Sequence, residues 1–169
     1  MVNVALLILR GVVGLIFVAH GSQKLLGWFG GPGLNTWAGV MNRMGLKPPE
    51  LWAWISGLSE FAGGLLFGLG FYTPMAAAAM ISAMIMAMIK VHWSNGFFNV
   101  NRGVEFNLTL VAVLVAVGLA GPGAYALGPQ TPFGWSVAGT FVVATLIGLI
   151  GVGIGLILAS ADQHVHRPA

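Results

Sequence analysis

The chain has 169 residues, which is enough for one domain, yet only 7% of them are charged and 57% are hydrophobic. Its mean hydropathy is +0.90. Because a soluble domain usually carries about 25% charged residues, this composition excludes a soluble monomer and predicts an integral membrane protein. The absence of cysteine excludes disulfides and cysteine-ligated metal centres. The seven Lys and Arg residues are scattered without forming a basic patch, so no nucleic-acid partner is expected.

Five segments are long and apolar enough to be membrane spans, which need about 20 mostly apolar residues. They cover residues 4–26, 51–71, 74–91, 104–120 and 135–160. The fourth ends at Gly121-Pro122-Gly123, a strong helix breaker. The predicted fold is therefore all-α and integral to the membrane. A four-helix domain over residues 1–127 is followed by an additional transmembrane helix and a short cytoplasmic tail over residues 128–169.

The loop after the first span contains a short amphipathic segment. Leu34, Trp37, Met41 and Met44 follow helical spacing, with polar residues off that stripe. This pattern predicts a short helix that lies on the cytoplasmic surface of the membrane.

Two pairs of glycines are spaced for close helix packing. Gly64 and Gly68 lie in the second span, and Gly151 and Gly155 in the fifth. Small residues four apart let membrane helices approach closely. The contact can lie within the chain, or the pair in the fifth span can form a homodimer face.

Basic residues mark one side of the membrane. The loops after the first and third spans, with their flanking span ends, hold Lys24, Arg43, Lys47, Lys90 and Arg102, and the other two loops hold none. Since basic loops stay in the cytoplasm, the N-terminus is expected outside and the C-terminus in the cytoplasm.

Several ionisable residues lie inside the predicted spans, where a charge costs about 2.5–3.5 kcal/mol on insertion scales. At a helical rise of about 1.5 Å per residue, His20 lies about 7 Å, Glu60 about 14 Å and Arg10 about 22 Å from the cytoplasmic face. Matching these depths predicts one polar pocket open to the cytoplasmic leaflet. Its expected members are His20, Lys24, Glu60, His92 and Glu105.

Structural roles are the alternatives for the same residues. Lys24 lies at a span end, from which a long cationic side chain commonly reaches the lipid headgroups. Arg10 and Glu60 are a candidate buried ion pair that fixes helix register. His20 is also compatible with a packing role.

The chemistry that this set of residues supports best is quinone binding. A bis-histidine haem would require His20 and His92, the only pair within the spans, and is not expected. A di-metal site would require several glutamates in Glu-x-x-His patterns, so no metal site is predicted. A quinone requires an apolar slot, aromatic walls, a hydrogen-bond donor to each carbonyl, and a carboxylate if protons move with the electrons.

Residues 9–31, LRGVVGLIFVAHGSQKLLGWFGG, resemble the opening signature of the DoxX family. The resemblance continues through SEFAGG at 59–64, HWSNGFF at 92–98 and GVEFNL at 103–108, and covers residues 5 to about 127. It implies a four-helix bacterial inner-membrane protein associated with quinone-linked redox chemistry. The fifth span lies beyond the family's four helices.

By this resemblance we expect a membrane subunit of a quinone-linked oxidoreductase, with a quinone-like small molecule and a redox protein as partners. The alternatives are a non-catalytic anchor of a redox or stress-defence complex, or a small-molecule transporter. The candidate catalytic residues are His20, Lys24, Glu60 and Glu105. The candidate quinone-binding residues are Arg10, His20, Trp28, His92 and Trp93.

Overall fold

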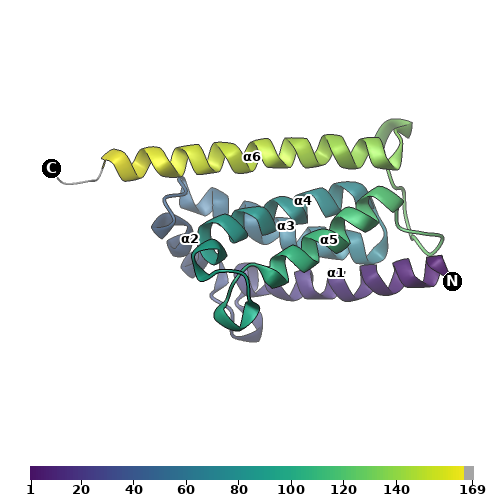
Figure 1. Ribbon diagram of the computed structural model, residues 1–169, viewed down its shortest axis with the longest axis horizontal. Coiled ribbons are helices and arrows are strands. Elements are labelled where there is room, and N and C mark those ends of the chain that lie inside the picture. The colour runs from purple at the N-terminus through teal and green to yellow at the C-terminus, as the bar shows by residue number, and fades with distance from the viewer. Residues whose placement is uncertain (166–169) are drawn as a thin grey trace.

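The computed structural model describes residues 1–165, and its long helices run roughly along one common direction, with α2 inclined to them at one end (Figure 1). The α-helices are α1 (Val2–Leu26), α2 (Gly33–Arg43), α3 (Pro49–Leu69), α4 (Thr73–Ala87), α5 (Glu105–Ala120) and α6 (Val137–Val165). A π-helix (Met88–His92) continues α4, and short 3₁₀ turns cover Trp28–Gly30, Trp93–Asn95, Asn99–Asn101 and Pro132–Gly134. All five predicted spans are helices, with ends within a few residues of the predicted ones, except that α6 continues past residue 160 to Val165.

Within the described residues, three helices are long and apolar enough to cross a membrane. They are Val2–Leu26, Thr73–Asn95 and Val137–Ala161. The other two predicted spans are α5, which is apolar but has 16 residues, and α3, which has 21 residues and contains the buried Glu60. The fold is that of an all-helical, multi-pass membrane protein, as the composition predicts.

The outer faces of the helices are apolar. On α6, Leu146, Ile150, Ile154 and Ile157 share one exposed face, and on α1 the side chains of Ile8 and Leu15 are exposed. Exposed apolar surface of this extent would not be stable in water. These faces are suited to contact lipid.

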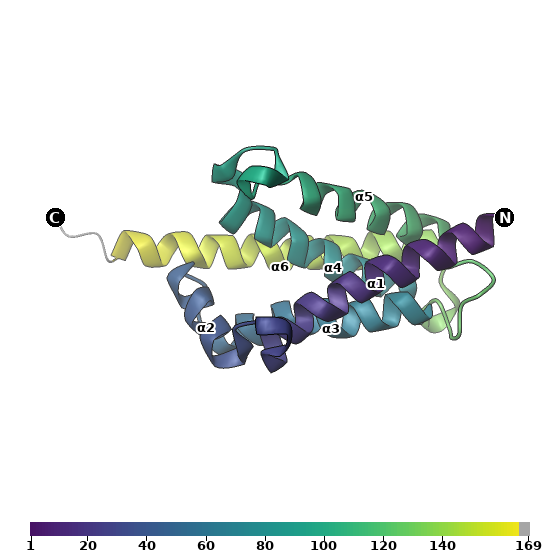
Figure 2. The same ribbon diagram turned by 90° about the horizontal axis from the view of Figure 1, so that it is seen from below.

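The most extensive helix contact joins α1 and α3, which confirms that the first two spans are neighbours. Glycines make it close: a Cβ on Gly14 would lie 2.7 Å from the Gly64 carbonyl oxygen, and one on Gly21 would lie 2.6 Å from Phe61 Cα. Gly64 and Gly68 therefore serve packing within the chain. In the view of Figure 2, α4 lies between α3 and α5.

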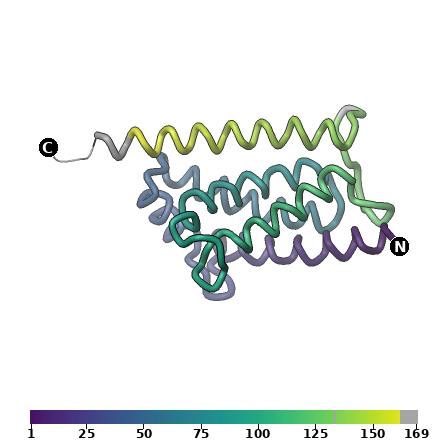
Figure 3. The backbone as a smooth tube through the Cα atoms, viewed as in Figure 1, coloured from purple at the N-terminus to yellow at the C-terminus, as the bar shows by residue number. Residues whose placement is uncertain are grey.

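Helix α6 packs mainly along α4 and starts at the same end of the bundle as α1 (Figure 3). A Cβ on Gly155 would lie 2.6 Å from the Trp52 ring, and Gly151 lines a cavity between the helices. This face of α6 is turned into the chain. These contacts favour packing within the chain, and a homodimer stays a prediction.

The amphipathic segment in the first loop is helical, as predicted. Helix α2 packs against α3, with Ala38 and Met41 buried, and Trp37 Nε1 donates a hydrogen bond to Ser56 Oγ at 2.8 Å. The structure gives this segment a partner in α3, and its position on the cytoplasmic membrane surface stays a prediction. Its apolar stripe finds a partner within the bundle because α3 offers apolar surface at the same level.

Candidate functional site

A buried ion pair between α1 and α3 is the centre of the site. The Lys24 ammonium contacts Glu60 Oε1, with the Glu60 side chain 1% exposed and that of Lys24 16% exposed. The same ammonium lies 4.7 Å from the centre of the Trp37 ring, a cation–π distance. The alternative in which Lys24 reaches the headgroups is wrong, because the carboxylate and the ring hold it inside the protein.

Glu60 keeps one oxygen without a partner. Its Oε2 atom is buried and has no hydrogen bond to any described residue. A buried carboxylate oxygen without a partner is costly. It is thus available to a ligand that donates a hydrogen bond.

A polar cavity of about 250 Å³ lies beside this ion pair. Phe17, Trp37 and Phe106 supply its aromatic wall. The ionisable and amide side chains that line it are His20, Lys24, Glu60, His92, Asn99 and Asn107. The structure therefore brings together four of the five residues of the predicted pocket.

The two histidines of this cavity differ in their hydrogen bonding. His92 Nδ1 lies 2.7 Å from the Arg102 carbonyl oxygen. A carbonyl only accepts, so Nδ1 donates, and in a neutral ring Nε2 is then an acceptor. His20 is exposed and makes no hydrogen bond with a described residue. The hydrogen bond to Arg102 therefore fixes the orientation of the His92 ring, whereas no hydrogen bond to a described residue fixes that of the His20 ring.

Glu105, the fifth predicted member, lines neither this cavity nor the apolar cavity described below. Its Oε2 accepts a hydrogen bond from the Asn99 backbone N–H at 2.8 Å. Since Asn99 lines the polar cavity, Glu105 supports a loop that contributes to the wall of this cavity.

Arg10 lies away from this cavity. It is fully buried, and its guanidinium donates to the Gly68 carbonyl at 3.2 Å and the Tyr125 carbonyl at 3.1 Å. Gly68 follows Glu60 by eight residues, or about 12 Å along a helix. An Arg10–Glu60 ion pair is therefore wrong, because the ion-pair partner of Glu60 is Lys24.

We expect Arg10→Met to destabilise the protein by about 1–3 kcal/mol, because two carbonyls in partly buried hydrogen bonds lose their donor. The measurement is the midpoint of thermal unfolding in detergent. Arg43→Met, which removes an exposed arginine, is the matched control and should leave the midpoint unchanged. Equal midpoints for both variants would contradict a structural role for Arg10.

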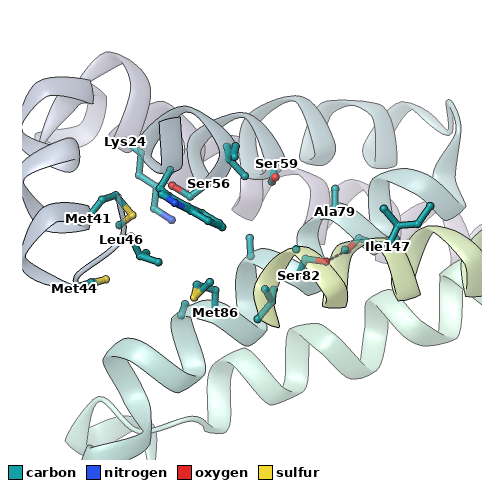
Figure 4. A pocket seen from close by; sticks show the side chains of 18 of the residues that line it. Lys24, Met41, Met44, Leu46, Ser56, Ser59, Ala79, Ser82, Met86 and Ile147 are labelled. Carbon is teal, nitrogen blue, oxygen red and sulfur yellow. Dashed lines mark hydrogen bonds between the residues drawn. The ribbon is translucent and has the colours of Figure 1, made fainter. Parts of the chain in front are cut away.

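A second, apolar cavity of about 470 Å³ lies among α2, α3, α4 and α6 (Figure 4). Its size falls within the usual range for ligand pockets, about 300–1,000 Å³. Figure 4 shows Met41 and Met44 on one side, Met86 and Ser82 on α4, and Ile147 on α6. Lys24 and Trp37 line this cavity and the polar one.

Trp28 and Trp93 lie outside both cavities, with 56% and 71% of their surfaces exposed. Conversely, Trp37, Asn99 and Asn107 line the polar cavity and were not among the predicted site residues. The sequence does single out Asn107, because it is a polar residue inside an apolar span. In the structure it is buried, and its amide contacts Met84 Sδ at 3.4 Å.

Together these observations define a multi-pass membrane protein with a partly polar cavity at one end of its bundle. The family model of DoxX matches residues 5–93, from α1 to the segment that follows α4. The chain belongs to the DoxX family. The match ends short of residue 127, to which the sequence motifs extend the resemblance. Neither a curated protein nor a solved structure matches the chain.

Proposed function

We propose that the chain is the membrane subunit of a quinone-linked oxidoreductase and that it binds the quinone ring in the polar cavity. The observation that carries this proposal is the buried Lys24–Glu60 pair, whose second carboxylate oxygen has no partner among the described residues. Two histidines line the same cavity. This arrangement combines hydrogen-bond donors with acceptors, one of them the Glu60 carboxylate, around one ring-sized space.

The residues fit both redox forms of a quinone. The carbonyls of a quinone accept hydrogen bonds, which Lys24 and the Asn107 amide can donate. The hydroxyls of a quinol donate hydrogen bonds, which Glu60 Oε2 and His92 Nε2 can accept. Phe17, Trp37 and Phe106 give the ring an apolar, aromatic surface.

Reduction of a quinone to a quinol consumes two electrons and two protons. We assign the electrons to a partner redox protein and the proton transfers to Glu60 and His20. Glu60 is buried, and His20 lines the cavity while exposed at its edge. A proton can therefore pass from the surroundings to His20 and from there into the cavity.

The proposed orientation in a bacterial inner membrane places this cavity near the cytoplasmic side. The carboxyl end of α1, helix α2, and the segment between α4 and α5 lie at one end of the bundle (Figure 1). Four of the basic residues that predict the cytoplasmic side, Lys24, Arg43, Lys90 and Arg102, belong to these segments, and Lys47 lies in the turn between α2 and α3.

The direct test is mass spectrometry of small molecules extracted from the detergent-purified protein, against an unrelated membrane protein from the same host. We expect a quinone enriched to about one per chain. No enrichment, together with no binding of added quinone, would contradict the proposal and favour an anchor or a transporter.

We also expect His20→Ala to lower the rate of quinone reduction by about 10²-fold or more, the lower end of the usual contribution of proton transfer. The variant should fold normally, because His20 makes no hydrogen bond with a described residue. The control is Leu15→Ala, an exposed position on the same helix outside both cavities. Undiminished turnover in His20→Ala would remove His20 from the mechanism.

A further inference from the structure

We infer that the substrate is a prenylated quinone whose isoprenoid chain lies in the apolar cavity among α2, α3, α4 and α6. This inference rests on the proposed function and adds the class of quinone to it. It assigns the isoprenoid chain a separate site, beside the site for the quinone ring.

The apolar cavity is long. On α4 and its continuation, the residues that line it extend from Met75 to Val91. At a rise of about 1.5 Å per residue this stretch is about 24 Å long. A slot of that length is suited to an extended chain more than to a compact ring.

The wall of this cavity offers little to a polar ligand. Two of its serines are already bonded within the chain: Ser56 Oγ donates to the Ala53 carbonyl, and Ser82 Oγ donates to the Ala78 carbonyl. Four methionines line it, and their flexible, polarisable side chains adapt to irregular apolar groups. Its chemistry therefore matches a branched hydrocarbon.

The two cavities adjoin each other. Lys24, Trp37, Ala87 and Val91 line both of them. The Lys24 ammonium, held by Glu60 and the Trp37 ring, lies at the boundary that the two cavities share. One molecule with a polar ring and an apolar chain would therefore place each part in the cavity that suits it, and a lipid acyl chain alone would leave the polar cavity unused.

The test compares two ligands on the full-length protein in detergent by isothermal titration calorimetry. One is dimethoxy-methyl-benzoquinone without a chain, and the other is the same ring with two isoprene units. We expect the prenylated ligand to bind at least about tenfold more tightly, because its chain leaves water or micelle for a matched apolar cavity. Equal affinities would overturn the inference and leave the proposed function intact. Binding of neither ligand would overturn both.

Gly151→Leu tests where the isoprenoid chain binds. Gly151 lines the apolar cavity, and no atom lies within 4 Å of a Cβ built there, so a leucine would fill the cavity without a backbone clash. We expect this variant to lose the tenfold preference and keep its affinity for the chainless ring. The control is Gly153→Leu on the same helix, which also has no atom within 4 Å but lines neither cavity. A preference that survives in Gly151→Leu, or disappears equally in both variants, would overturn the inference.

Discussion

Lys24→Met should destabilise the protein by about 3–5 kcal/mol, the usual cost of removing one partner of a buried ion pair. Glu60 is 1% exposed, and Lys24 Nζ is its only hydrogen-bond partner among the described residues. Without Lys24, the carboxylate must either remain charged and unpaired or take up a proton. The measurement is chemical unfolding in detergent. Lys90→Met, which removes a basic residue outside both cavities, is the control.

The double variant Lys24→Met with Glu60→Leu separates stability from chemistry. Replacement of both charges by apolar side chains of similar volume is often neutral or stabilising. We therefore expect the double variant to recover most of the lost stability while quinone reduction stays abolished. Glu60→Gln should likewise lose turnover, since an amide cannot take up the proton. A stable double variant that turns over at the wild-type rate would show that the pair is structural only.

Hydropathy predicts the five helices well because the membrane imposes long apolar segments with few charges. Hydropathy predicts less well which residues contact the charged side chains inside the spans. Depth matching placed Glu60 between His20 and Arg10, whereas Gly21 packs against Phe61 and so brings Glu60 closer to the Lys24 end of α1. The register of two packed helices depends on where their small residues meet, which span limits alone do not give.

Four of the five residues expected in the polar pocket line one cavity, because chemistry and approximate depth already group them. Two features had no comparable sequence signal. Arg10 is held by backbone carbonyls of Gly68 and Tyr125, which any residue type could supply. The apolar cavity depends on how α2 and α6 pack against α3 and α4, a tertiary arrangement that the local pattern of α2 does not determine.

The close contact of α1 and α3 makes a second large effect testable. Gly21→Ala places a methyl group 2.6 Å from Phe61 Cα, where the obstacle is backbone and cannot rotate away. The helices must therefore separate, at a cost of about 1–3 kcal/mol for overpacking. Gly21 lies one turn before Lys24 and opposite the neighbour of Glu60, so the separation also disturbs the ion pair.

We therefore expect Gly21→Ala to lower both the midpoint of thermal unfolding and the rate of quinone reduction, although its side chain lines neither cavity. Gly11→Ala is the matched control, because no atom lies within 4 Å of a Cβ at that position of the same helix. It should be at least as stable as the wild type, since alanine favours a helix over glycine. If Gly21→Ala matched Gly11→Ala in both measurements, the close contact of α1 and α3 would not be what holds Lys24 against Glu60. A loss confined to Gly21→Ala would show that the spacing of these two helices sets the geometry of the site.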